Sequence, residues 1–306
     1  MERHIMYMTG FADEAGKDLA TQMRVTRELG WHNIEARNVE IDGESGNLHD
    51  ISDKAFAKVV EQLGEAGLSV NCFGSAIGNY KHEIDDPFDI TLEEVRRCIP
   101  RMQRLGSKMV RMMSYAVRKR DDGADHDDQM DEERFRRLRE ILRMFTDAGV
   151  VPVHENCMNY GGMSWKHTLR MIENVPGLKL VFDTGNPVFT NDRNRPAPQP
   201  KQSAWEFYEQ VREHVAYIHI KDGRMTPDRD KPIYCYPGEG DGEVRRIMAD
   251  MLARGYDGGV SIEPHMAAVH HDPNEPRKTN AAEIYIEYGR RMERLIAELK
   301  AAGSAQ

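Results

Sequence analysis

The chain has 306 residues, of which 40% are hydrophobic, and its 51 acidic residues outnumber 42 Lys and Arg, which gives a formal net charge of −9. This apolar content argues against a disordered chain. The acidic balance argues against a nucleic acid or an anionic membrane as the main partner, because either normally attracts clustered Lys and Arg.

The four cysteines, Cys72, Cys98, Cys157 and Cys235, form neither a CxxC pair nor the dense framework of a small secreted domain. The apolar run at 5–11 is too short for the core of a signal peptide. No stretch approaches the roughly 20 apolar residues of a membrane span. We therefore expect a soluble, uncleaved cytoplasmic protein with reduced thiols.

Short apolar runs alternate with longer amphipathic segments along the whole chain. The runs predict eight strands, at 5–11, 33–36, 68–73, 108–113, 150–155, 178–183, 216–221 and 259–264. Apolar residues spaced by three and four predict helices at 19–29, 53–66, 92–105, 135–148, 165–173, 205–211 and 244–253. A further helix is expected after the last strand, at about 281–300.

Eight strand–helix units predict an α/β fold, a single (β/α)8 TIM barrel domain over residues 1–306. A doubly wound open sheet is the structural alternative, but the number of units favours the barrel. Three long polar connections, 114–130, 190–202 and 224–241, follow strands, so we expect them at the end of the barrel that carries active sites. For the first of them, a plain solvated loop is an equal alternative.

Alternate residues of a barrel strand point inward, and four successive strands place an inward polar residue near their ends. These residues are Glu155, Asp183, His219 and Glu263. A buried carboxylate must be paired, protonated or bound to a cation, because the desolvation of a bare charge costs several kcal/mol. One such residue alone is more often a satisfied core residue, but four on adjacent strands favour a divalent metal site. Oxygen-rich ligation without thiolate suits Mn²⁺, Mg²⁺ or Co²⁺ better than structural zinc.

The segments VHENCMNYGG, LVFDTGNPVF, YIHIKDG, PGEGDG and VSIEPHM resemble the xylose isomerase-like TIM barrel family. The resemblance covers essentially the whole chain and is greatest to the sugar phosphate isomerase/epimerase group with its ketose 3-epimerases. It implies that Glu155, Asp183, His219 and Glu263 bind one divalent metal ion, Mn²⁺ ahead of Mg²⁺, Co²⁺ or Zn²⁺. Glu155 and Glu263 are then the catalytic proton-transfer groups.

The resemblance implies an isomerase or epimerase that acts on a keto-sugar or sugar phosphate. A proton leaves the carbon next to the carbonyl, and the metal stabilises the enediolate that forms. Ketose 3-epimerases usually carry His three residues after the metal-binding Asp and Arg six after the metal-binding His, where this chain has Asn186 and Met225. A metal-dependent lyase or hydratase that acts on a 3-oxo-glycoside or keto-sugar therefore stays open as the alternative.

Five further residues are candidates for substrate binding: Asn186, Lys221, Arg224, His265 and Glu35. A salt bridge is an equal alternative for Glu35, and a core or capping role is favoured for His154 because of its outward parity.

Two further motifs have plain alternatives. The PGEGDG motif could present amides to a phosphate, although a tight turn explains it as well. The residues His265, His270, His271 and Asp272 have the composition of a second metal site, but a solvated loop is favoured.

Two other functions of this fold are less favoured. A DNA-repair endonuclease would need three zinc ions and basic loops, and a binding protein without activity would leave the acidic cluster vestigial. A small-molecule sugar is the expected partner, and a homo-oligomer is possible.

Overall fold

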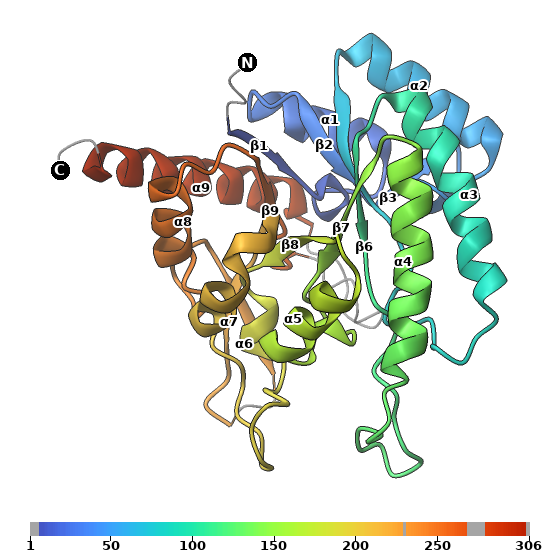
Figure 1. Cartoon of the computed structure of the whole chain (residues 1–306). Helices are drawn as coiled ribbons and strands as arrows, with labels where there is room; N and C mark the ends of the chain where they lie inside the picture. Colours follow the sequence, from blue (N-terminus) through green and yellow to red (C-terminus); the bar gives the residue numbers. More distant parts are fainter. Residues whose placement is uncertain (1–5, 229–230, 268–278, 304–306) are drawn as a thin grey trace.

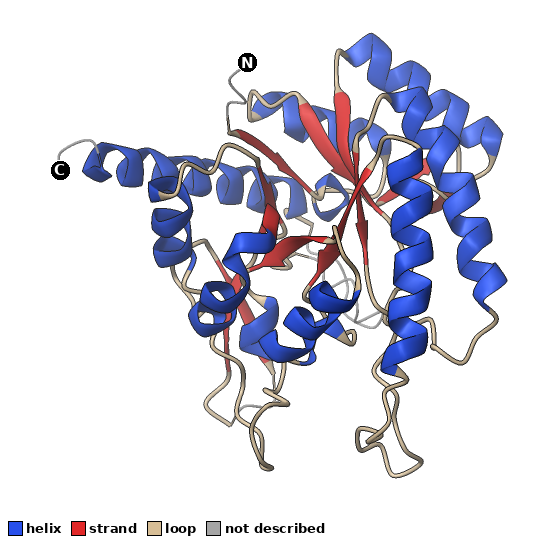
Figure 2. Cartoon of the chain, viewed as in Figure 1, coloured by secondary structure: helices blue, strands red, loops and turns tan. Residues whose placement is uncertain are grey.

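The computed structural model describes residues 6–228, 231–267 and 279–303, and its centre is a barrel of eight parallel strands (Figures 1 and 2). These strands are β1 (Tyr7–Gly10), β2 (Asn33–Ala36), β5 (Ser69–Gly74), β6 (Met109–Met112), β7 (Val151–Glu155), β8 (Lys179–Asp183), β9 (Val215–Ile220) and β12 (Gly259–Ile262). They pair in the order β1-β12-β9-β8-β7-β6-β5-β2, and a parallel bridge between Phe11 and Glu35 joins the two ends of the sheet. The predicted barrel is confirmed, and each of its strands lies within or beside one of the eight predicted runs.

Helices cover the outside of this barrel (Figure 2). They are α1 (Leu19–Glu28), α2 (Asp53–Ala66), α3 (Phe88–Leu105), α4 (Asp131–Asp147), α5 (Trp165–Asn174), α6 (Asn186–Phe189), α7 (Ala204–Val211), α8 (Val244–Ala253) and α9 (Ala281–Gly303), with short 3-10 helices at Ala12–Glu14, Gly161–Met163 and Arg212–His214. The sequence explains their ends: the side chain of Ser52 caps the start of α2, and Gly67 ends it at a φ of 65°. None of the described helices combines the length and the apolar character that a membrane crossing requires.

Two antiparallel hairpins stand beside the barrel, and the sequence analysis predicted neither. The first joins β3 (Asn38–Ile41) to β4 (Glu44–Asn47) directly after β2, and the second joins β10 (Asp222–Met225) to β11 (Pro232–Cys235) after β9. The connection predicted as a loop at 224–241 therefore contains part of a hairpin. Figure 1 shows the long connections around 114–130 and 190–202 projecting from the same end of the barrel, as predicted.

The buried apolar side chains form two separate clusters, one inside the barrel and one between its strands and the surrounding helices. A small inner cluster contains Cys72, Val153, Val181 and Tyr217. The last three lie two residues before Glu155, Asp183 and His219 and therefore share their inward parity. The larger cluster lies between strands and helices and runs along the chain from Ala12 to Ile296. This continuity supports our proposal that the chain forms one domain that includes α9. All four cysteines are buried thiols.

Candidate active site

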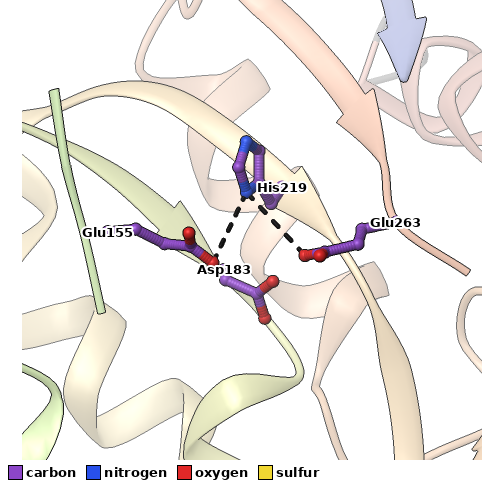
Figure 3. Close-up of side chains that lie close together, drawn as sticks. All are labelled: Glu155, Asp183, His219 and Glu263. Atoms are coloured by element: carbon purple, nitrogen blue, oxygen red, sulfur yellow. Dashed lines mark ion pairs between the residues drawn. The ribbon is translucent and has the colours of Figure 1, made fainter. Parts of the chain in front are cut away.

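Four buried polar side chains converge at the carboxyl ends of neighbouring strands. Glu155 ends β7, Asp183 ends β8, His219 lies in β9, and Glu263 directly follows β12. One ligand atom from each lies within 4.8 Å of the others, and none of the four residues is more than 3% exposed. Figure 3 shows their side chains pointing toward a common centre, with Glu155 and Glu263 on opposite sides.

Asp183 is held by the turn that follows its strand. Its Oδ1 accepts hydrogen bonds from the backbone N–H of Gly185 at 2.8 Å and of Asn186 at 2.7 Å, where α6 begins. Its Oδ2 accepts no hydrogen bond from the described residues, although Lys221 Nζ lies 2.8 Å away as an ion-pair partner. The turn therefore fixes the carboxylate and leaves one oxygen directed at the centre.

His219 is oriented from behind by Glu35. Its Nε2 lies 3.0 Å from Glu35 Oε2, so it donates to that carboxylate. Its Nδ1 has no hydrogen-bond partner among the described residues and lies 3.7 Å from Glu155 Oε1 and 3.9 Å from Glu263 Oε2. A carboxylate that holds one ring nitrogen while the other faces a cluster of acids is the usual support of a metal-binding histidine.

Glu35 does not line the pocket, in contrast to the substrate-contacting role considered for it. It is fully buried and also accepts hydrogen bonds from Tyr217 Oη at 2.9 Å and from Ser261 Oγ at 2.6 Å. Glu35 lies inside the barrel because its position in β2 points inward, as those of Glu155, Asp183 and His219 do in their strands. Glu35 is therefore placed to position His219.

Two buried arginines hold the two glutamates, and the sequence analysis missed both. Arg111 Nη1 donates to Glu155 Oε2 at 2.7 Å, and Arg37 Nη1 donates to Glu263 Oε1 at 2.9 Å. Both guanidinium groups lie over the ring of Phe11, at 5.3 and 4.2 Å from its centroid. Both had a readable signal: Arg111 and Arg37 have inward parity in or just after a buried strand, and a buried arginine requires a partner as a buried carboxylate does.

Lys221 enters the same cluster. Its Nζ lies 2.8 Å from Asp183 Oδ2 and 2.9 Å from Glu263 Oε2. The side chain passes directly over Gly185, where an added Cβ would lie 2.7 Å from Lys221 Cγ. Glycine at that position therefore allows the lysine to reach the carboxylates.

The cluster carries an excess of buried negative charge. Six buried carboxylates, on Asp13, Glu14, Glu35, Glu155, Asp183 and Glu263, surround three buried cations, on Arg37, Arg111 and Lys221. The difference of three negative charges is compensated in part by His219, whose pKa is raised to about 10, because Glu35 and Glu155 overcome the effect of burial. Burial and the neighbouring Glu263 and Glu155 also raise the pKa of Asp183 to about 7, although Lys221 opposes them.

The two glutamates remain ionised. Burial disfavours their charge, but Arg111 and His219 lower the pKa of Glu155, and Lys221, His265 and Arg37 lower that of Glu263. The three-oxygen, one-nitrogen donor set, its surplus of negative charge and the unpartnered His219 Nδ1 together fit a divalent cation.

A pocket of about 330 Å³ opens onto this cluster. One part of its wall is polar and comes from the residue directly after β2, from the first hairpin and from the loop after β5: Arg37, Asn38, Asn47, Asn79, Lys81 and His82. Apolar and aromatic side chains form another part: Met113, Met158, Phe189, Tyr80 and Tyr234. The floor exposes Glu155, Glu263, Lys221 and Arg111 to a ligand.

Three of the five predicted substrate-binding residues line this pocket, namely Asn186, Lys221 and His265. Asn186 also donates from Nδ2 to Glu155 Oε1 at 3.1 Å. The structure does not bring Arg224 to the site: it lies exposed in β10, with Nη1 3.5 Å from the carbonyl oxygen of Glu239.

His265 is held in an unusual backbone conformation, with a φ of 52°. Glu14 binds it twice, accepting from its backbone N–H at 2.6 Å and lying 2.7 Å from its Nδ1. Glu14 was not a candidate from the sequence. His270, His271 and Asp272, considered with His265 as a second metal site, lie outside the described residues.

The glycine-rich PGEGDG motif forms a turn around a carboxylate of the chain itself. Asp222 accepts hydrogen bonds from the backbone N–H groups of Gly238, Gly240 and Gly242, at 2.8, 3.1 and 2.9 Å. These amides are therefore already used, which supports the tight-turn interpretation over a phosphate loop. His154 is fully buried, with Nε2 2.9 Å from Ser114 Oγ, in agreement with a core role.

The sequence model of the xylose isomerase-like TIM barrel family matches residues 23–286. The chain therefore belongs to this family, as its motifs suggested. No curated protein matches the chain closely in sequence.

Three solved structures illustrate the similarity in fold. A xylose isomerase-like TIM barrel protein from Mycobacterium smegmatis in complex with magnesium is 16% identical, with a TM-score of 0.67 over 97% of this chain and 98% of that one. A D-tagatose 3-epimerase-like protein is 17% identical, with a TM-score of 0.65 over 96% and 99%. The probable 3-DHS dehydratase AsbF from Bacillus anthracis is 14% identical, with a TM-score of 0.65 over 94% and 99%. At these identities the similarity establishes the fold.

Proposed function

We propose that the protein is a divalent-metal-dependent isomerase or epimerase of a keto-sugar or sugar phosphate. The convergence of Glu155, Asp183, His219 and Glu263 at the floor of a pocket carries this proposal. These four residues would hold one metal ion, with Mn²⁺ as the first candidate and His219 Nδ1 as the nitrogen ligand. When bound, such an ion polarises a substrate carbonyl and stabilises negative charge on its oxygen.

In this proposal the two glutamates move the protons. Glu155 and Glu263 reach the centre from opposite sides, so a sugar carbon between them would present one face to each (Figure 3). One ionised carboxylate removes the proton from the carbon next to the carbonyl and becomes the acid form. The other glutamate, once it has taken up a proton from solvent, donates that proton to the opposite face, which inverts that carbon. Arg111 and Arg37 fix the two carboxylates in place through their ion pairs.

The remaining pocket residues are suited to holding the sugar. Asn186 and Lys221 carry hydrogen-bond donors beside the proposed reacting carbon, and His265 lies on the Glu263 side of the pocket. Asn38, Asn47 and Asn79 add amide groups along the wall, which suit a ligand rich in hydroxyl groups.

Hydrogen exchange in D₂O tests this function directly. The Mn²⁺-loaded protein is incubated with a panel of free and phosphorylated ketoses, and deuterium at the carbon next to the carbonyl is followed by NMR. An isomerase or epimerase incorporates deuterium with at least one member of the panel and forms its isomer. Absence of both exchange and isomer across the panel would count against the proposal.

The apolar wall favours a second candidate, elimination from a keto-sugar that carries a bulky substituent. Met113, Met158 and Phe189 line the pocket, and Met158 is 45% exposed, so the wall offers contact to a group less polar than a sugar. Proton removal beside the carbonyl would then expel that group from the next carbon. Release of a free aglycone from an aryl 3-oxo-glycoside, without isomer formation, distinguishes this reaction from the first.

Replacing Glu35 by Gln is expected to weaken Mn²⁺ binding by about 10- to 100-fold, the usual cost of losing an outer-shell partner. Gln keeps the size of the side chain but removes the charge that orients His219 and supports its basicity. Isothermal titration with Mn²⁺ measures the affinity. Glu40→Gln, on the neighbouring hairpin, is the matched control and should bind as the wild type does, and equal affinities for all three proteins would contradict the role assigned to Glu35.

The affinity for Mn²⁺ should rise with pH. In the metal-free protein the pKa of His219 is about 10 and that of Asp183 about 7, and both groups must lose a proton to become ligands. One proton is therefore released between pH 7 and 9, so the association constant should rise about tenfold per pH unit there, and more steeply below pH 7, where Asp183 is also protonated. Titrations at several pH values measure this slope, and a pH-independent affinity would show that His219 Nδ1 is not a ligand.

A further inference from the structure

A second group of ligand-type side chains lies outside the floor of the pocket, between the end of β4 and helix α3. His49, Asp50 and Glu94 each direct one ligand atom into a common space, within 4.8 Å of one another. The proposed function does not use any of these residues, and no motif in the sequence indicated them. The first two follow the β3–β4 hairpin, and Glu94 lies in the second turn of α3.

His49 is prepared as a nitrogen ligand. It is fully buried, and its Nδ1 forms a short hydrogen bond with Asn47 Oδ1. Because the amide oxygen only accepts, Nδ1 carries the hydrogen and Nε2 keeps its lone pair. That Nε2 has no hydrogen-bond partner among the described residues and lies 3.5 Å from Asp50 Oδ2. Burial lowers the pKa of His49 to about 4, which keeps the ring neutral at physiological pH.

Glu94 presents a second buried atom without a hydrogen bond. The residue is 9% exposed, and its Oε2 has no hydrogen-bond partner in the described part of the chain. Burial and the nearby Asp50 raise the pKa of Glu94 to about 7, so its charge is poorly compensated. His82 Nδ1, 3.9 Å from Oε2, is too distant to donate to it.

Asp50 completes the set with one oxygen to spare. Arg97 Nη2 donates to its Oδ1 at 2.6 Å, which leaves Oδ2 directed toward His49. Arg97 therefore neutralises the charge of Asp50, but it gives no partner to His49 Nε2 or Glu94 Oε2. A buried nitrogen lone pair and a buried carboxylate oxygen side by side are costly unless something binds both.

We propose that His49, Asp50 and Glu94 form a second binding site for a divalent transition metal ion of the Zn²⁺ class. Ligands of a tetrahedral zinc ion with bonds of 2.0–2.1 Å are separated by about 3.3 Å, close to the 3.5 Å between His49 Nε2 and Asp50 Oδ2. His82, whose Nδ1 lies 3.9 Å from Glu94 Oε2, could supply a fourth ligand, and water is the other source. The hydrogen bond of His49 Nδ1 to an amide oxygen is the orientation that such ligands usually receive.

The site would stabilise one wall of the catalytic pocket. Asn47 and His82 both line that pocket, and Asn47 Nδ2 also donates to the carbonyl oxygen of Gly74 at the end of β5 at 2.9 Å. A metal ion bound by His49 and Glu94 would tie the first hairpin to α3 across the loop that carries His82. The second ion is therefore structural, and it acts on the pocket through the position of this wall.

Zinc stoichiometry of the full-length protein tests the proposal. After metal removal, equilibrium dialysis against Zn²⁺ should load the Glu94→Gln protein with one ion fewer than the wild type. If the floor of the pocket also binds zinc, the wild type should hold two ions and the variant one. Glu93→Gln, an exposed neighbour on the same helix, should retain the wild-type number. Asp50→Asn changes a half-exposed side chain and serves as a second variant should Glu94→Gln not fold, as judged by circular dichroism.

The outcomes separate the two sites. One zinc ion on the wild type and none on the Glu94→Gln protein would support this second site and count against zinc binding at the floor of the pocket. Equal zinc content of the wild type and the folded variants at Glu94 and Asp50 would overturn the proposal.

Discussion

The Glu155→Gln protein is expected to exchange the substrate proton about 10²- to 10⁴-fold more slowly than the wild type, the usual contribution of a general acid or base. Gln preserves the size of the side chain and can still accept from Asn186 Nδ2, which lies 3.1 Å from Glu155 Oε1. It cannot take a proton from carbon, and it loses the ion pair with Arg111 at 2.7 Å. Deuterium incorporation into the best ketose of the panel, measured at saturating Mn²⁺, gives the rate.

Metal content must be measured together with the rate, because Glu155 is also a proposed ligand. A variant that keeps its Mn²⁺ but loses exchange identifies Glu155 as a proton-transfer group, and one that loses both identifies it first as a ligand. Glu263→Gln should show a comparable loss, whereas Glu209→Gln, an exposed carboxylate on α7, should be unaffected. Wild-type exchange by the Glu155 and Glu263 variants would contradict the proposed mechanism.

Periodicity was sufficient to predict the barrel because each strand is a short apolar run buried on both faces. The boundaries of α2 and α8 coincide with the predicted ones. Those of α3 and α4 differ at the first turn, where each helix begins about four residues earlier, in polar sequence. In α4 the first turn consists of Asp131, Glu132 and Glu133. These acidic residues stabilise the start of the helix because they lie near the positive end of its dipole.

The two hairpins were missed because each of their strands has only four residues. Only β3 shows a buried apolar alternation, at Val39 and Ile41, and two such residues are too few for a strong pattern. A turn signal was present in the first: Asp42-Gly43 joins β3 to β4, and both residues have positive φ, 52° and 80°. An Asp-Gly pair between two extended segments is a strong hairpin signal. The omission affected the site, since Asn38 and Asn47 of this hairpin form part of the pocket wall.

The convergence of the four proposed metal ligands followed from strand parity, which is a local property of the sequence. The partners of these residues are nonlocal, and sequence spacing does not contain them: Arg37 pairs with Glu263 and Glu35 with His219 across the barrel. The same parity rule, applied to β2 and β6, would also have put Glu35 and Arg111 inside the barrel. Which inward charge pairs with which depends on the register and closure of the sheet.

The Lys221→Met protein is expected to lose about 3–5 kcal/mol of unfolding free energy when no metal is present, the usual cost of breaking a buried ion pair on one side. Lys221 is 2% exposed and compensates both Asp183 Oδ2 and Glu263 Oε2. Methionine fills a similar volume without the charge, so two buried carboxylates lose a cation while Arg37 remains on one of them. Urea denaturation in the presence of EDTA measures the loss.

Saturating Mn²⁺ should restore much of this stability. A ligand at 100 times its dissociation constant stabilises a folded protein by about 2.7 kcal/mol, and the variant should gain more than the wild type because its site lacks a competing cation 2.8 Å from Asp183 Oδ2. Lys179→Met, at the exposed start of the same strand as Asp183, controls for loss of a lysine and should change neither value. If the stability gap between variant and wild type were equal with EDTA and with Mn²⁺, Lys221 and the metal would not share these carboxylates. If Mn²⁺ removes the difference in unfolding free energy between the two proteins, Lys221 neutralises the carboxylates in the metal-free barrel, and the metal ion takes over this role when it binds.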